Sequence, residues 1–213
     1  MVPDDRTGID RAIAVLQRGG IVALPTDTVY GIAVDLAVPE GIERLFAAKR
    51  RPPDKAIAVL VDGLDQVSGL VDLPPAASVL AEAGWPGGLT LVLRLIDPAR
   101  LPAALTAGIA TLGVRVPDHP TPREIARALG PLPTTSANLS GEPDSRDAAA
   151  VAAALGDAVD LILDGGATKG GIGSTVVDCT VDPPRVLRAG AIEPARLRAA
   201  LSDAGMDLDA GTA

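Results

Sequence analysis

Short apolar runs alternate with longer amphipathic stretches along this chain, and that alternation limits its fold more than any other feature. Amphipathic stretches with helical spacing predict helices, and brief apolar runs between them predict buried strands. Repeated alternation of the two is typical of α/β folds. We therefore expect one α/β domain over residues 1–204. The small and polar end, residues 205–213, is predicted to be a flexible tail.

The turn and capping signals place the elements. The pattern Thr7-Gly8-Ile9-Asp10 resembles a capping box that opens a helix, and Gly19-Gly20 ends it. Pro39 suits the first turn of a second helix that ends near Lys49. Further helices are predicted at 75–83, 122–129, 147–155 and 194–204. Strands are predicted at 21–24, 56–61, 90–95, 112–116, 132–135, 161–163, 174–181 and 186–188.

The composition excludes several kinds of chemistry. The 213 residues include one histidine, His119, and one cysteine, Cys179, which cannot form a multi-His or multi-Cys zinc site. Cys179 follows the apolar pair Val176-Val177, where a thiol is expected to be buried and inert. A Ser–His–Asp hydrolase would depend on His119, and no Gly-x-Ser-x-Gly motif is present. With a single thiol, no internal disulfide forms, as in a reducing compartment.

The net charge of −8 argues against a protein that mainly grips nucleic-acid backbone. The N-terminal sequence MVPDDRTGID is acidic, unlike a signal peptide, and no apolar run is long enough to span a bilayer. We expect a cytoplasmic protein without membrane contact. Only Tyr30, Phe46 and Trp85 are aromatic, so the core must consist of aliphatic side chains.

Three polar segments lie near predicted strand ends, where open α/β sheets place their ligands. Residues 25–31, PTDTVYG, fit either a turn or a binding loop. Residues 49–55, KRRPPDK, place four cations in seven positions, more than a helix end needs, and favour an anion site over a solvated helix end. Residues 134–141, TTSANLSG, fit a capping cluster or a phosphate cradle equally well.

The glycine-rich segment 165–175 resembles a P-loop but does not match one. A Walker A motif needs Gly-Lys-Ser/Thr in sequence, whereas Lys169 precedes the glycine pair and lies far from Ser174. The dinucleotide pattern fails as well, because position 176 is valine. A hinge or lid over a ligand is the preferred interpretation, and a flexible surface loop is the alternative.

Together these motifs resemble the YrdC-type threonylcarbamoyl-AMP synthase family. The similarity spans residues 8–192 and rests on PTDTVYG, KRRPPDK, WPGGLTLVL, LGVRVP, TTSANLSG and GSTVVD…RVLRAG in this order. It implies a single twisted open mixed sheet, flanked by helices, with a large concave pocket. The chain resembles the short form of the family, which lacks a second domain.

The resemblance also implies a reaction and its residues. L-threonine, bicarbonate and ATP would give threonylcarbamoyl-AMP and diphosphate, for t6A modification of tRNA position 37 by a separate transferase complex. The family signature, which we take as catalytic, corresponds to Lys49, Arg51, Ser136 and Asn138. ATP would contact Arg51, Lys55, Thr111, Ser136, Asp144 and Arg188. L-threonine would contact Thr28, Leu60, Arg115, Thr134 and Ser174.

The proposed chemistry needs positioning and charge rather than a covalent nucleophile. Lys49, Arg51, Lys55 and Arg188 would gather the phosphates, together with Mg²⁺ as the cofactor. No resident metal motif is expected, because Mg²⁺ takes most of its ligands from phosphates and waters. Two alternatives remain: a non-catalytic RNA-binding module, or a carbamoyl-adenylate-forming domain with another carbamoyl donor. Even as an enzyme, the chain could make a weak contact with tRNA.

Overall fold

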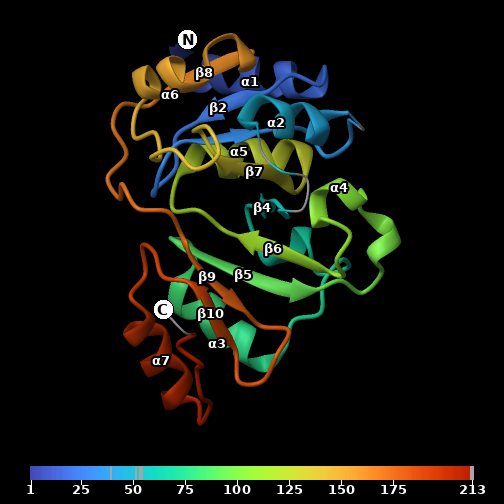
Figure 1. Cartoon of the computed structure of the whole chain (residues 1–213), viewed down its shortest axis with the longest axis vertical. Helices are drawn as coiled ribbons and strands as arrows, with labels where there is room; N and C mark the ends of the chain where they lie inside the picture. The colour runs from blue at the N-terminus through green and yellow to red at the C-terminus, as the bar shows by residue number, and fades with distance from the viewer. Residues whose placement is uncertain (39, 51, 53–54, 212–213) are drawn as a thin grey trace.

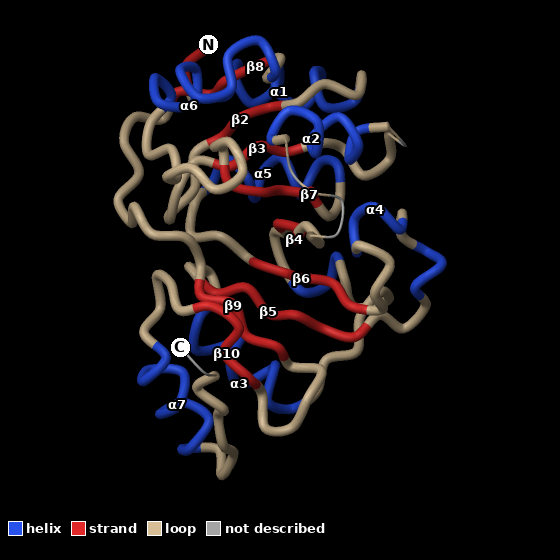
Figure 2. Tube along the Cα trace, in the orientation of Figure 1, coloured by secondary structure: helices blue, strands red, loops and turns tan. Residues whose placement is uncertain are grey.

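The apolar runs form strands of one mixed sheet in a computed structural model, which describes residues 1–38, 40–50, 52 and 55–211. Within these residues the sheet has ten strands in the order β1-β8-β2-β3-β7-β4-β6-β5-β9-β10. Figures 1 and 2 show the sheet running through the molecule from β8 near the N-terminus to β10 near the C-terminus. The strands are β1 Val2–Pro3, β2 Val22–Leu24, β3 Gly31–Ala33, β4 Ala58–Leu60, β5 Leu89–Arg94, β6 Thr111–Arg115, β7 Leu132–Ser136, β8 Leu161–Asp164, β9 Thr175–Asp178 and β10 Arg185–Arg188.

The expected α/β class with a mixed open sheet is confirmed. Strands β2, β3, β7 and β4 pair antiparallel in turn, whereas β4 with β6 and β5 with β9 are parallel. The helices are α1 Arg6–Gln17, α2 Gly41–Lys49, α3 Pro75–Gly84, α4 Ala103–Thr106, α5 Pro120–Leu129, α6 Ala148–Leu155 and α7 Pro194–Asp203. Short 3₁₀ turns cover Leu64–Gln66, Pro98–Arg100 and Gly156–Ala158.

Side-chain caps begin three of the helices. Asp5 accepts a hydrogen bond from the Gly8 N–H at the start of α1, and Asp147 accepts one from Ala150 at the start of α6. His119 caps α5 through Nδ1, and Pro120 follows it. The capping box predicted at Thr7 is wrong, because Asp5 is the cap and the helix already begins at Arg6.

Helices cover the sheet on different faces along its length. In the half nearest the N-terminus, α1 and α5 pack on one face, burying residues such as Leu16, Ile125 and Leu132 in a common cluster. In the other half, α3 and α7 contact each other, and α3 packs against β5. Their buried Leu80 and Leu197 belong to the larger cluster, which also includes α2 and α6.

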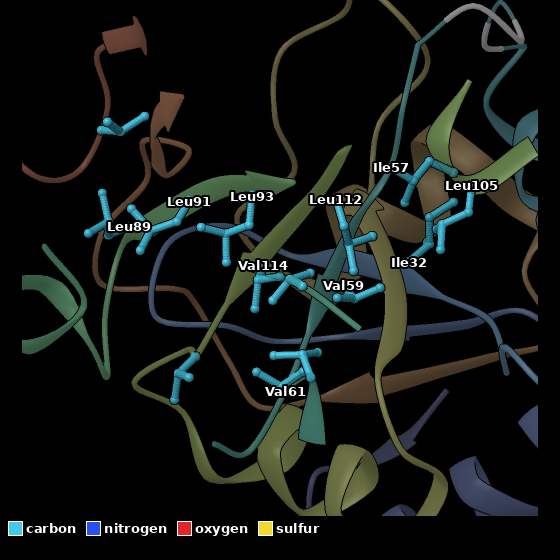
Figure 3. Close-up of a cluster of buried hydrophobic side chains, with 14 of the residues drawn as sticks. Ile32, Ile57, Val59, Val61, Leu89, Leu91, Leu93, Leu105, Leu112 and Val114 are labelled. Carbon is cyan, nitrogen blue, oxygen red and sulfur yellow. The ribbon is translucent and has the colours of Figure 1, made fainter. Parts of the chain in front are cut away.

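Strict alternation along β4, β5 and β6 gives the sheet one apolar and one open face. Figure 3 shows the core side chains of these strands gathered in one cluster; they include Val59, Leu89, Leu91, Leu93, Leu112 and Val114. The residues between them point the other way, because successive side chains of a strand alternate in direction. A cavity opens on that second face.

Several features differ from the sequence-based expectations: strands β1 and β3 and the short helix α4 were not predicted, and the C-terminal segment 205–211 is ordered. Strand β3 was not predicted, because its Gly-Ile-Ala sequence directly follows a run of turn-forming residues. The expected flexible tail is held in place over residues 205–211: Gly205 and Met206 hydrogen-bond back to α7, and Asp209 pairs with β10, whereas residues 212 and 213 lie outside the described residues. The Val186 N–H donates to the Asp209 carbonyl at 2.9 Å, and Arg185 Nε lies 2.7 Å from an Asp209 carboxylate oxygen. Leu208 is buried in the core.

Candidate active site

A cavity of about 400 Å³ opens on the uncovered face of the sheet. Its floor comes from alternate residues of neighbouring strands, among them Thr90 and Val92 of β5 and Gly113 and Arg115 of β6. The loop after β2, the end of β7 and the segment before β9 form its walls. Segments far apart in the sequence therefore meet at this cavity. The sequence analysis predicted a ligand site near the strand ends for these polar segments.

Most of the residues proposed from the family resemblance line this one cavity. They are Thr28, Leu60, Thr111, Arg115, Thr134, Ser136, Asp144, Ser174 and Arg188. Three others, Lys49, Lys55 and Asn138, are described but do not line it. Arg51, assigned to the signature and to ATP, lies outside the described residues.

Burial divides the lining residues into two groups. All five proposed for L-threonine are buried; they are Thr28, Leu60, Arg115, Thr134 and Ser174. Of those proposed for ATP, Asp144 and Arg188 are exposed, and Thr111 and Ser136 are half-buried. The cavity thus has a deep end with fixed polar groups and an outer end that faces solvent.

Arg115 is the cation of the deep end and is only 6% exposed. Its guanidinium donates to the Gly87 carbonyl at 2.9 Å, to Thr28 Oγ1 at 2.9 Å and to Asp27 Oδ1 at 2.6 Å. Burial lowers the pKa of Arg115, and the nearby Asp27 carboxylate opposes that shift. Because the guanidinium remains charged in proteins, it can pair with a carboxylate that enters the cavity.

Ser174 connects the two ends. Its hydroxyl lies 2.8 Å from the Thr90 hydroxyl, and its carbonyl accepts two hydrogen bonds from Arg188, from Nε at 3.1 Å and from Nη2 at 2.8 Å. Thr90 was missed in the sequence because it stands in the apolar run LTLVL. The alternation Thr90, Val92, Arg94 opposite three leucines could have identified it as facing away from the core.

Lys49 occupies a different position from the one expected. It is only 2% exposed, and its Nζ donates to the Ser136 carbonyl, to the Asn138 carbonyl at 2.6 Å and to Asn138 Oδ1 at 3.0 Å. The Ser136 hydroxyl donates to the same Asn138 oxygen at 2.6 Å. Lys49 therefore anchors the end of β7 and the loop after it, without lining the cavity; its expected contact with phosphates stays a prediction.

The glycine-rich segment 165–175 lies across the 26–31 loop. The Tyr30 hydroxyl donates to the Gly166 carbonyl at 2.9 Å and accepts from the Gly165 N–H at 3.1 Å. The Gly171 N–H donates to the Thr28 carbonyl at 2.7 Å. A Cβ at Gly170 would lie 2.7 Å from the Asp27 carbonyl oxygen, so only glycine allows this close approach.

The single histidine and cysteine have structural surroundings. His119 uses Nδ1 to cap α5, and burial lowers its pKa. Cys179 is buried at the end of β9, and burial raises the pKa of its thiol to about 12. A thiolate is therefore scarce near neutral pH, which supports the expectation that Cys179 is inert.

The described residues around the cavity include few side chains that could ligate a metal ion. Among the described residues, no group of three or more His, Cys, Asp or Glu side chains could hold a metal ion. Asp144 supplies the one carboxylate in the described lining. Mg²⁺ in phosphate-transfer sites often uses only one or two protein carboxylates, so Asp144 fits such an ion. Within the described part of the chain, no helix is both long and apolar enough to cross a bilayer.

The fold and the site define an α/β protein with a concave pocket that has one buried end and one end that faces solvent. Residues 14–190 match the Sua5/YciO/YrdC domain, whose description reads "Telomere recombination". The chain belongs to this family, which confirms the resemblance.

Two curated relatives support the assignment. A putative threonylcarbamoyl-AMP synthase of Mycobacterium tuberculosis is 39% identical over 197 residues, covering 92% of this chain and 90% of the relative. The threonylcarbamoyl-AMP synthase of Bacillus subtilis is 36% identical, and the match covers 93% of this chain but 58% of that protein.

Solved structures agree with this fold. The Sua5 protein of Pyrococcus abyssi, solved in complex with L-threonine, has a TM-score of 0.87 and 33% identity, over 94% of this chain and 58% of that one. YciO of Escherichia coli has a TM-score of 0.82 and 27% identity, over 92% of this chain and 97% of that one.

Proposed function

We propose that this protein is an L-threonylcarbamoyladenylate synthase, a nucleotidyltransferase that acts in t6A formation at tRNA position 37. The observation that carries the proposal is the division of one cavity into a deep end around Arg115 and a solvent-facing end around Arg188. A small zwitterion fits the first, and a large polyanion fits the second. The names of the relatives and the L-threonine in the Sua5 structure support the same substrates.

At the deep end, Arg115 pairs with the carboxylate of L-threonine. The buried hydroxyls of Thr28 and Ser174 lie beside it and can contact the polar groups of the amino acid. Leu60 supplies an apolar side chain and Thr134 a hydroxyl to the wall of this end of the cavity. This combination selects a short side chain that carries both a methyl group and a hydroxyl.

At the outer end, Arg188 contacts the phosphates and Thr111, Ser136 and Asp144 line their path. Exposed Ile109 and Leu187 also line the cavity, at 54% and 55% exposure. Because the chain has only three aromatic residues, we assign these aliphatic side chains to the adenine base. Lys55 is exposed and lies beside this region in sequence, and with Arg51 it remains a proposed phosphate contact.

The reaction proceeds in two steps. The threonine amine adds to CO₂ derived from bicarbonate and loses a proton, which gives a carbamate. A carbamate oxygen then forms a bond to the α-phosphorus while the bond to the β-phosphate oxygen breaks and diphosphate leaves. The protein aligns two anions that repel each other and stabilises the charge on the leaving group.

Mg²⁺ would be held by Asp144 and the phosphates, and when bound it neutralises phosphate charge. The role of Lys49 is to position Ser136 and Asn138 at the cavity edge, because its Nζ contacts both residues. The product passes to a tRNA threonylcarbamoyl transferase complex. Because that modification takes place on tRNA, we place the enzyme in the cytoplasm.

Diphosphate release tests the proposal. The protein is incubated with ATP, Mg²⁺ and bicarbonate, and diphosphate should appear only after L-threonine is added. Carbamoyl phosphate in place of threonine and bicarbonate tests the related carbamoyl-adenylate chemistry. Salt-sensitive tRNA binding without threonine-dependent diphosphate release would instead favour the RNA-binding alternative.

A further inference from the structure

Asp27 forms an ion pair with Arg115, the cation of the deep end. It does not line the cavity, whereas its neighbours Thr26 and Thr28 do. One oxygen of its carboxylate, Oδ1, accepts from Arg115 Nη2 at 2.6 Å and from the Asp118 N–H at 3.1 Å. Its side chain is 17% exposed, and that of Arg115 is 8% exposed. Asp27 is thus a largely buried counter-ion of Arg115 that does not itself line the cavity.

The three acceptors of Arg115 come from two separate segments of the chain. Thr28 and Asp27 belong to the loop after β2, and Gly87 belongs to the turn before β5. A guanidinium has five N–H groups, and these described contacts use one each. Two N–H groups therefore remain for a ligand, in a plane that the three contacts fix.

We propose that Asp27 is a positioning residue for amino-acid recognition: it orients Arg115 so that the remaining N–H groups meet the substrate carboxylate. This inference rests on the proposed function, since it takes an α-carboxylate as the ligand of Arg115. It adds a residue to the site that does not itself touch the substrate. The loop 26–31 would then contribute to binding in two ways: Thr28 would contact the substrate, and Asp27 would orient Arg115.

Two physical effects of Asp27 oppose each other. Its negative charge repels an incoming carboxylate, so removing that charge would by itself favour binding. Losing the hydrogen bond frees the guanidinium to rotate, and misplacement by about 1 Å can cost roughly 100-fold in a positioned contact. The buried, short and charge-assisted bond makes the second effect the larger one. Asparagine keeps an acceptor oxygen and should therefore do less harm than alanine.

The test compares two ligands that differ only at the carboxylate. Binding of L-threonine and of L-threoninamide is measured by calorimetry on the wild type and on Asp27→Ala and Asp27→Asn. Asp118→Asn is the matched control, because it removes an acidic charge from an exposed neighbour whose backbone, not side chain, reaches Asp27. Binding of the non-cleavable analogue α,β-methylene-ATP shows that each variant is folded and keeps its outer site.

We expect the wild type to prefer L-threonine over L-threoninamide by roughly 100-fold, since only the acid forms the charged pair with Arg115. Asp27→Ala should reduce this preference by about 10-fold or more and Asp27→Asn by about 3-fold, while Asp118→Asn leaves it unchanged. The affinity for the ATP analogue should stay within about 2-fold in all variants.

If Asp27 had a purely structural role, its loss would reduce the affinity for L-threonine and for L-threoninamide equally. The preference between the two ligands would then be unchanged. That result in Asp27→Ala, with analogue binding intact, overturns the proposal. If Asp27→Ala no longer binds the ATP analogue, Asp27→Asn is used in its place. An unchanged preference for L-threonine over L-threoninamide in Asp27→Asn then overturns the proposal. A wild type that does not discriminate between the two ligands contradicts the proposed function instead, so the two failures are distinguishable.

Discussion

The two ends of the cavity hold their cations in opposite ways. At the deep end, Arg115 is buried and held by three acceptors. At the outer end, Arg188 is exposed and its described hydrogen bonds all go to one residue, to the carbonyl and the hydroxyl of Ser174. A buried ion pair costs desolvation but fixes geometry, whereas an exposed cation keeps its hydration and its freedom to move. The deep end is therefore built to select one small ligand, and the outer end to attract charge.

The largest effect is expected from Arg115→Ala. The variant should lose roughly 1,000-fold in kcat/KM for L-threonine, because it removes two charge-assisted hydrogen bonds from a desolvated carboxylate. The Kd of α,β-methylene-ATP should change little. Steady-state kinetics and calorimetry measure the two quantities, and circular dichroism checks the fold. Equal losses for both ligands would show that the two ends are not separate.

Lys49→Met tests the support behind the cavity edge. Methionine has a similar length but no donor, so the Ser136 and Asn138 oxygens that Nζ now contacts lose a partner. We expect a loss of about 3 kcal/mol in the free energy of unfolding, the usual scale for buried bonds to a charged donor. Urea denaturation measures it. Lys49→Arg is the control for charge alone; wild-type stability in Lys49→Met would show that this contact contributes nothing.

Lys49 also shows how far the sequence alone could go. The motif 49–55 has the composition of an anion site, and the alternation of strands and helices was sufficient to predict the fold class. Whether a lysine at a helix end points into a pocket or back into the protein depends on the packing of distant segments. Here the loop after β7, almost 90 positions later, provides the oxygens. No local pattern contains that information.

Thr90 and Asp27 were missed for related reasons. Thr90 stands in the apolar run LTLVL, and its partner Ser174 directly precedes β9, a strand from much later in the chain that pairs with β5. Asp27 was noticed as part of a turn, yet its ion pair with Arg115 forms only when β6 lies beside that turn. The residues proposed as ligand contacts came from the family resemblance, whereas the hydrogen bonds that hold them required the three-dimensional arrangement.

Arg188→Ala should have a smaller effect than Arg115→Ala, and it should affect ATP rather than L-threonine. We expect the KM for ATP to rise by roughly 30-fold and the KM for L-threonine by no more than about 3-fold, because solvent screens an exposed cation. Arg188→Lys retains the charge and should recover part of the loss. Raising the ionic strength should weaken ATP binding in the wild type more than in Arg188→Ala. A rise confined to threonine would reverse the assignment of the two ends.

The smallest effect is expected at the boundary between the two ends. Thr90→Val keeps the shape of the side chain and removes the hydroxyl that lies 2.8 Å from Ser174 Oγ. The Ser174 hydroxyl still has Arg188 Nη2 at 3.3 Å, so it should turn toward the outer end. We expect the KM for L-threonine to rise by about 5- to 10-fold, on the scale of one buried neutral hydrogen bond. Thr90→Ser keeps the hydroxyl and serves as the control. A change in the KM for ATP of the same size would mean that Ser174 couples the two ends energetically, and the deep end would then no longer be an independent, rigid site.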